Sequence, residues 1–368
     1  MRSSICLGLG ILLLGAAPAC GDDNTSDDTG GDDGGTGDGG TVATGYEETD
    51  LLSDVQDEAP KLDVNLQNPW GLAFGDDTVF WISNQASATA TICDESGAAV
   101  GGGDVTVPQG PTGVVYNTDE EGFFIGSGTA AAGSEFIFAT VGGGLFGWSP
   151  DADPTAAIQA VDASDVGASY TGLAQADSGS ESLLYSADFH NAQVAVYDAD
   201  FNPVDLGPDA FVDPDLPDGF APFGIHNVDG QLFVTFAQQD ENAEEEVEGP
   251  GLGYVSEFDS DGTFVRRVMS EGELNAPWGV AMAPDDFGDF SGALLVGNLG
   301  DGRITALDPD SGDVLGQLTD ADGAPIAIEG LWAIAFGNGL DAGQTDELYF
   351  TAGIGDEAHG LFGRLTAL

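Results

Sequence analysis

The 368-residue chain carries 64 acidic residues, only 6 lysine and arginine residues, and a formal net charge of −58. A surface of this charge repels the phosphates of nucleic acids and anionic lipid headgroups, which excludes both as direct partners. The same charge density destabilises a compact state unless dissolved ions screen it. We therefore interpret the acidic composition as a halophilic adaptation, that is, a means of staying soluble in salty surroundings.

Residues 1–19 have the features of an export signal peptide. Arg2 supplies a positive charge, the apolar run of residues 7–14 follows, and this run is too short to span a bilayer. A cysteine at the expected cleavage point, Cys20, resembles a bacterial lipobox, although Pro18 departs from that pattern. We predict a lipoprotein acylated at Cys20, at the outer membrane or cell surface, which contacts the membrane only through its lipid. The alternative is an ordinary signal peptide that leaves the protein secreted.

A low-complexity segment separates Cys20 from the rest of the chain. Residues 21–45 are almost wholly glycine, aspartate, threonine and serine, with seven aspartates and no base. Such a stretch cannot bury enough apolar surface to offset its ordering entropy, and its like charges extend it. We predict that residues 20–46 are a disordered acidic linker, used as a tether rather than as a calcium-binding loop.

From about Tyr46 onward, short apolar runs rich in β-branched and aromatic residues alternate with glycine-containing turns, which indicates an all-β fold. One element recurs six times, for example as Asn-Pro-Trp-Gly-Leu-Ala-Phe at 68–74 and Ala-Pro-Trp-Gly-Val-Ala at 276–281. Its aligned positions, 71, 113, 172, 224, 279 and 333, lie 42 to 59 residues apart. Short strands repeating at about 40 to 50 residues are typical of propeller blades.

Each copy of this element is followed by a second apolar run, and then by a third run and a turn. The sequence therefore predicts a six-bladed β-propeller of four-stranded antiparallel blades over residues 47–368. The chain stops one strand short of a complete sixth blade, and the segment 48–55 is expected to supply that strand. Joining the two ends in one sheet removes an exposed sheet edge.

Three strings of residues carry a resemblance to a known family: Asn-Ala-Pro-Trp-Gly at 275–279, Phe-Gly-Asp-Phe-Ser-Gly at 287–292 and Leu-Val-Gly-Asn-Leu-Gly-Asp-Gly at 295–302. They resemble an uncharacterised family of exported bacterial propellers, NHL-like in organisation and noted in genomes that encode PEP-CTERM sorting. The resemblance covers about residues 47–368 and implies the fold and export, but no reaction. This chain shows no C-terminal Pro-Glu-Pro motif, and we expect Cys20 to replace that anchor.

In a propeller, the loops into the innermost strands and the loops between second and third strands share one face. Side chains there are expected to surround the mouth of the central channel. The oxygen-bearing candidates for a calcium ion are Asn84, Asp188, Asn298 and Asp301, with Glu329 as an addition. The alternative is that these residues only cap turns, as asparagine and aspartate often do.

The same face holds the candidate catalytic residues, Asp188 and His190, the second of which would act as a general base. Of the other histidines, His226 is expected to pack within an innermost strand and His359 to be exposed. The sequence contains no nucleophile elbow, phosphate-binding loop, dinucleotide fingerprint or Cys/His zinc cluster. Cys93 is expected to be a small buried hydrophobe.

Three tryptophans, Trp70, Trp278 and Trp332, occupy equivalent positions in their repeats. They are candidates for an aromatic ligand-binding rim, and the alternative is packing between blades.

Two functions remain open from the sequence. The first is a non-catalytic binding or scaffolding module at the cell surface, whose ligand is an unknown small molecule, glycan or protein on the propeller face. The alternative is a calcium-dependent hydrolase of the lactonase or esterase type, with its site at the channel mouth. Metal would then polarise a carbonyl while Asp188 or His190 activates water.

Overall fold

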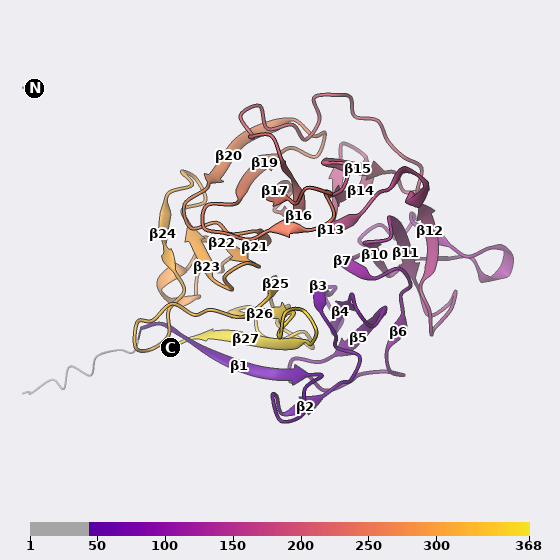
Figure 1. The fold of residues 1–368 in the computed structure, drawn as a ribbon. Helices are drawn as coiled ribbons and strands as arrows, with labels where there is room; N and C mark the ends of the chain where they lie inside the picture. Colours follow the sequence, from indigo (N-terminus) through magenta and orange to yellow (C-terminus); the bar gives the residue numbers. More distant parts are fainter. Residues whose placement is uncertain (1–43) are drawn as a thin grey trace, which may run out of the picture. The chain divides into compact units, whose positions relative to one another are not determined.

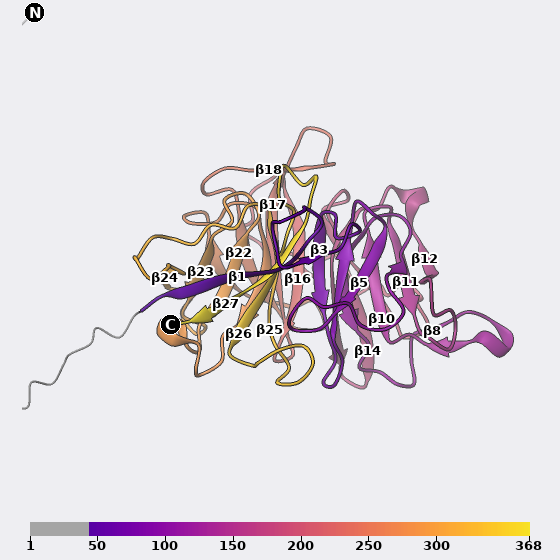
Figure 2. The same cartoon turned by 90° about the horizontal axis from the view of Figure 1, so that it is seen from below.

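The computed structural model describes residues 44–368, which form a six-bladed β-propeller, as predicted (Figures 1 and 2). The predicted signal peptide, Cys20 and nearly all of the predicted tether lie outside the described residues. No helix in residues 44–368 has the length and apolar character needed to cross a membrane.

Four of the six blades are separate sheets of consecutive antiparallel strands. The first blade contains β3 (Pro69–Ala73), β4 (Phe80–Asn84), β5 (Thr89–Cys93) and β6 (Val105–Thr106). The second contains β7 (Pro111–Tyr116), β10 (Phe136–Thr140), β11 (Gly144–Trp148) and β12 (Ile158–Asp162). The fourth contains β16 (Phe220–Val228), β17 (Gln231–Gln239), β19 (Tyr254–Phe258) and β20 (Phe264–Ser270), with β18 (Glu246–Val247) paired to β17. The fifth contains β21 (Pro277–Met282), β22 (Leu294–Asn298), β23 (Ile304–Leu307) and β24 (Val314–Gln317).

Short elements fill the remaining connections between the strands. They are the hairpin β8 (Phe124–Ile125) and β9 (Ala132–Gly133), and the 3₁₀ turns η1 (Gly128–Ala130), η2 (Ser164–Val166) and η3 (Gly288–Phe290).

The third blade has only three strands, β13 (Tyr170–Ser178), β14 (Glu181–Asp188) and β15 (Gln193–Tyr197). The prediction of four strands in every blade is therefore wrong for this blade. The segment that follows β15 carries Pro203, Pro208, Pro214 and Pro217. Proline has no N–H for a strand ladder, so this segment makes one bridge, between Tyr197 and Pro203, and then continues as a loop.

The sixth blade joins the two ends of the described chain, as predicted. Its strands are β25 (Leu331–Phe336), β26 (Glu347–Ala352), β27 (Leu361–Ala367) and, from the other end of the chain, β1 (Tyr46–Ser53). The short β2 (Lys61–Leu62) adds to β1 in parallel. Since β1 pairs antiparallel with β27, the last blade of the ring is completed by the first strand of the chain.

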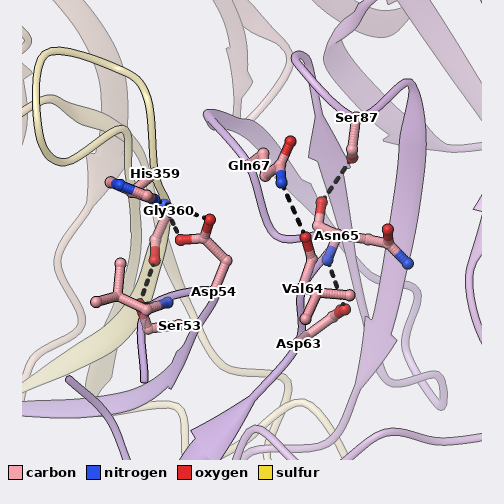
Figure 3. Close-up of polar contacts among 10 residues, drawn as sticks. Ser53, Asp54, Asp63, Val64, Asn65, Gln67, Ser87, His359 and Gly360 are labelled. Atoms are coloured by element: carbon pink, nitrogen blue, oxygen red, sulfur yellow. Dashed lines mark hydrogen bonds and ion pairs between the residues drawn. The ribbon is translucent and has the colours of Figure 1, made fainter. Parts of the chain in front are cut away.

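Side chains at the end of β1 hold this closure in place (Figure 3). Ser53 Oγ donates a hydrogen bond to the Gly360 carbonyl at 2.7 Å. The Asp54 carboxylate accepts the Gly360 N–H at 2.8 Å and contacts His359 Nδ1 at 3.0 Å. In the next segment, Ser87 Oγ donates to the Asn65 carbonyl at 2.6 Å and ties the approach to β3 to the first blade.

The recurring glycine of the innermost strands has a steric reason. A Cβ at Gly279 would lie 2.7 Å from the Trp332 carbonyl oxygen of the next blade, and a Cβ at Gly172 2.9 Å from the Ile225 amide nitrogen. Backbone atoms cannot yield to such a contact, so only glycine allows the innermost strands to approach this closely. Close contact between the innermost strands of neighbouring blades therefore explains why glycine repeats at this position.

Apolar side chains fill the spaces between blades, which is why β4, β10 and β22 are buried along their whole length. Cys93 lies within this core and is fully buried, as predicted. Burial raises the pKa of its thiol, which acts here as a small apolar side chain.

Candidate functional site

Trp70, Trp278 and Trp332 meet in the middle of the ring. The rings of Trp70 and Trp332 stack with centroids 3.6 Å apart, and Trp278 meets both edge-on. Phe223, on the opposite side of the ring from Trp70, closes the cluster with a centroid distance of 6.3 Å. All four side chains are buried, so they fill one end of the channel and do not form an open rim. Their position agrees with the alternative interpretation, in which the three tryptophans pack between blades.

Of the residues predicted to share a calcium ion, the three that end second strands lie in different blades. Asn84 ends β4, Asp188 ends β14 and Asn298 ends β22, and each side chain is buried. Within residues 44–368, no three His, Cys, Asp or Glu side chains are arranged to hold a metal ion. Asn298 and Asp301 contact each other, and Asp301 and Glu329 line one recess, whereas Asn84 and Asp188 lie in other blades. The calcium site stays a prediction.

Each of these side chains is hydrogen-bonded within its own blade. Asp188 accepts hydrogen bonds from the Ser169 N–H at 3.1 Å, from Asn191 Nδ2 at 2.8 Å and from Gln193 Nε2 at 3.3 Å. Asn84 Nδ2 donates to Thr91 Oγ1 at 2.8 Å. These hydrogen bonds agree with the alternative interpretation, in which the residues cap turns and do not bind calcium.

The fifth blade repeats the pattern. Asn298 Nδ2 donates to the Glu273 carbonyl at 2.7 Å and to Asp301 Oδ1 at 3.1 Å. Glu329 Oε1 accepts the Gly355 N–H at 3.1 Å. The side-chain oxygens of Asp188, Asn298, Asp301 and Glu329 are thus used in local hydrogen bonds. Asn84 Oδ1 is buried and has no hydrogen-bond partner.

His190 is bonded away from Asp188. Its Nδ1 lies 3.0 Å from the Ala243 carbonyl, to which it donates, and no hydrogen bond joins it to Asp188 in the described chain. This contact links the third blade to the acidic segment after β17, residues 240–249, which contains five glutamates. The imidazole of His190 therefore helps to hold that segment in position.

Glu248 of the acidic segment and Asp356 and Glu357 of the loop between β26 and β27 line one acidic recess. In Figure 2, which views the ring edge-on, β18 lies at the top of the molecule, on this face. Burial, followed by repulsion from Glu357, Glu245 and Glu248, raises the pKa of Glu246 to about 7. Burial also raises the pKa of Glu357, although Asn68 Nδ2 donates a hydrogen bond to it at 2.7 Å. Sequence reasoning missed Glu357, because its partners are distant in the chain.

A cavity of about 800 Å³ lies at the other end of the channel. It is lined by the later parts of all six innermost strands: Gly71–Asp76, Gly113–Thr118, Leu173–Asp177, Ile225–Asp229, Val280–Met282 and Ala333–Phe336. Trp278 belongs to both the aromatic cluster and the cavity lining, so the cluster forms the inner end of the cavity. Sequence reasoning had placed the site at the opposite, filled end.

Polar groups of the cavity are held in fixed positions. Gln175 Nε2 donates to Asn117 Oδ1 at 3.0 Å and to Ser182 Oγ at 2.9 Å, while its Oε1 accepts the Thr118 N–H at 3.2 Å. Asn227 Nδ2 donates to the Gln175 carbonyl at 2.8 Å. This network joins three blades and makes one wall of the cavity rigid.

His226 is the one histidine that lines this cavity. Its Nε2 lies 2.8 Å from the Trp278 carbonyl, so Nε2 carries the hydrogen and Nδ1 carries a lone pair. Burial lowers the pKa of His226 to about 4, which the hydrogen bond to Trp278 opposes only in part. The imidazole is therefore neutral at pH 7 and offers a hydrogen-bond acceptor.

Charge around the cavity has one sign. Its lining includes Asp76, Glu120, Asp177 and Asp229, from four different blades, and contains no lysine or arginine. Such a lining attracts cations, admits neutral molecules and disfavours anions.

Comparison with known proteins places the chain in a family. It is 34% identical over 331 residues to the uncharacterized protein R648 of Acanthamoeba polyphaga mimivirus, covering 86% of this chain and 78% of that protein. It is 32% identical over 330 residues to the uncharacterized protein L690 of the same virus, covering 86% of this chain and 84% of that protein. The chain belongs to the family that contains these proteins. No protein-family model matches it.

Solved structures confirm the fold alone. A protein of unknown function from Bacteroides thetaiotaomicron superimposes with a TM-score of 0.53 at 12% identity, covering 89% of this chain and 73% of that one. The soluble aldose sugar dehydrogenase of Escherichia coli gives a TM-score of 0.50 at 13% identity, covering 88% of this chain and all of that one.

Proposed function

We propose that the protein is a binding module that takes a small molecule into the cavity of its central channel. The observation that carries this proposal is the cavity of about 800 Å³, to which all six innermost strands contribute. Its volume is within the range of small-molecule sites, and its inner end is a packed aromatic cluster. Asp188, His190, Asn84 and Asn298 lie outside its lining, so the proposed function is non-catalytic and does not use them.

The ligand is neutral or cationic and forms hydrogen bonds. The four acidic residues and the lack of lysine and arginine in the lining support this choice of charge. His226 Nδ1 supplies an acceptor, and the innermost strands expose the backbone edge that no further strand covers. A neutral sugar or a small organic amine has suitable chemistry for such a cavity.

We further propose that the propeller of residues 47–368 is exported and displayed on the tether of residues 20–46, with residues 1–19 as the signal peptide. The apolar run before Cys20, the acidic linker and the resemblance to exported bacterial propellers support this. Replacing Cys20 with alanine is expected to move the protein from the membrane fraction to the soluble fraction and to remove the mass of the acyl chains.

The three histidines allow a direct test of the binding site. In protein labelled with ¹⁵N at histidine, His226 reports on the channel cavity, while His190 and His359 lie outside its lining. We would titrate the protein with spermidine, with glucose and with calcium chloride, and follow the imidazole signals by NMR. A saturable shift of His226 with spermidine or glucose is the expected result.

Two results would contradict the proposal. One is the absence of any saturable His226 shift with either organic probe. The other is a calcium response confined to His190, accompanied by ester or lactone hydrolysis that Asp188→Ala abolishes; this would favour the calcium-dependent hydrolase. His226→Phe removes the acceptor and should weaken binding, whereas His359→Phe is the matched control outside the cavity.

A further inference from the structure

The lining of the channel cavity changes with depth. The six innermost strands, β3, β7, β13, β16, β21 and β25, surround the channel (Figure 1). They carry the repeated element, whose aligned positions are 71, 113, 172, 224, 279 and 333. Residues at the same offset from these positions therefore lie at about the same depth in the cavity.

Two residues after the aligned position, the lining contains a single polar side chain, that of His226. The other five residues at this depth are apolar and mostly small: Ala73, Val115, Ala174, Ala281 and Ala335. Within residues 44–368, His226 Nδ1 has no hydrogen-bond partner, and unlike the indole nitrogen of Trp70 it is not shut off from solvent. Burial keeps the imidazole neutral at pH 7, so Nδ1 can accept a hydrogen bond from a cation without repelling it.

Five residues after the aligned position, three of the six blades carry an aspartate: Asp76, Asp177 and Asp229. All three are exposed. Within the described chain their carboxylates make no hydrogen bond, whereas Asp94 Oδ1 accepts the Ser96 N–H of its own turn at 2.9 Å. The three belong to the first, third and fourth blades, so they approach the channel mouth from different sides. Carboxylates that the fold leaves unpaired favour a cationic group at this depth.

Apolar side chains lie between these two levels. Phe74, Tyr116, Met282 and Phe336 line the cavity three residues after the aligned position. Along a strand, three residues span about 10 Å, which separates the level of His226 from that of the aspartates. A ligand that contacts both levels is therefore elongated, with a polar group at each end and an apolar chain between them. A sugar, which bears hydroxyl groups along its whole length, matches this arrangement less well.

On the basis of the proposed function, we propose that the ligand of the channel cavity is a linear aliphatic diamine. One ammonium group lies among Asp76, Asp177 and Asp229, and the other donates a hydrogen bond to His226 Nδ1. The methylene chain lies along the apolar level between them.

Three probes separate charge from length. The first, 1,8-diaminooctane, is long enough to reach both levels; 1,4-diaminobutane is too short, and 1,8-octanediol has the length without the charge. Calorimetric titration of the full chain at constant ionic strength, with the His226 signal followed by NMR, is expected to show one diaminooctane bound per chain. The other two probes should bind at least about tenfold more weakly.

Variants at the two levels should act differently. Asp177→Asn combined with Asp229→Asn should weaken diaminooctane about tenfold and octanediol by less than about twofold. Glu241→Gln combined with Glu244→Gln is the matched control, because it removes two exposed carboxylates outside the lining, and it should change both affinities by less than about twofold. His226→Phe should weaken both long probes, since both donate to Nδ1.

The diamine is overturned, and the binding module is not, if octanediol gives a saturable His226 shift and diaminooctane binds no more tightly. Absence of a saturable His226 shift with either long probe would overturn both proposals. Equal losses in the two double variants would also overturn the diamine, because binding would then depend only on the net charge of the chain.

Discussion

His226 and Trp278 are joined by a hydrogen bond that crosses from the fourth blade to the fifth, with His226 Nε2 donating to the Trp278 carbonyl at 2.8 Å. The two rings also meet edge-on, with centroids 5.3 Å apart. The bond fixes the tautomer of the imidazole and ties the aromatic cluster to the wall of the channel cavity. A neutral His226 is thus part of both the fold and the proposed site.

This contact predicts a specific pH dependence of stability. The pKa of His226 is about 4 in the folded chain and about 6.5 in an unfolded one. As pH falls from about 6.5 to about 4, the unfolded chain takes up a proton before the folded chain does, so the free energy of unfolding decreases. His226→Gln removes this titration. Relative to the variant, the parent should lose about 1–3 kcal/mol between pH 7 and pH 4, measured by chemical denaturation.

The comparison between parent and variant is essential, because 64 acidic residues titrate in an overlapping range. Above pH 7 the two stability profiles should run parallel. Parallel profiles down to pH 4 would show that the imidazole is not desolvated in the folded chain.

Because the innermost strands approach so closely, we expect that adding even the methyl group of alanine in place of a glycine lowers the stability of the fold. Gly279→Ala places a Cβ against the Trp332 carbonyl oxygen, and relief requires the two backbones to separate. We expect a loss of about 1–3 kcal/mol in the free energy of unfolding. Gly102→Ala is the matched control, since its Cβ would meet open space. Equal stability of the two variants would contradict the proposed role of the repeated glycine.

The sequence predicted the ring because the features that build it are local and repeated. Most blades repeat an aligned glycine in the innermost strand and a second apolar run, which often ends in Asn, Asp or Thr. The spacing of these repeats along the chain therefore predicted the number of blades. The missing fourth strand of the third blade also has a local cause, the four prolines after Tyr197. Those prolines were visible in the sequence, and more weight on their lack of an N–H would have predicted the loop.

The position of the open cavity was beyond the reach of the sequence. It depends on Trp70, Trp278 and Trp332 turning inward from different blades and filling one end of the channel. Neither the direction of a side chain nor the space left at the other end follows from the repeat pattern. His226 was expected to pack within its strand, and only the three-dimensional arrangement shows that it lines the cavity.

The buried ion pair between Asp213 and Arg267 leads us to expect that losing one partner costs more stability than losing both. The side chain of Asp213 is fully buried and lies 2.6 Å from Arg267, with Ser256 Oγ also donating to it. Burial alone would raise the pKa of Asp213, but these hydrogen bonds and the Arg267 charge lower it. Arg267→Met leaves a buried carboxylate unpaired and should cost about 3–5 kcal/mol.

Adding Asp213→Asn to Arg267→Met should restore much of that loss, because the buried charge is gone. Lys61→Met removes a positive charge from an exposed position and should change stability by less than about 0.5 kcal/mol. If both charge variants destabilise equally, the net charge of the chain and not the buried pair is responsible.

The closure of the ring predicts where unfolding begins when Asp54 is replaced. Asp54→Ala leaves the Gly360 N–H without its acceptor and removes the contact with His359 (Figure 3). The expected loss is about 1–3 kcal/mol, with hydrogen exchange accelerating first in β1 and β27 and last in β22 of the fifth blade. Glu58→Ala, on the exposed turn that follows, is the control and should leave exchange unchanged. Uniform acceleration across all six blades would show that Asp54 contributes to global stability without closing the ring.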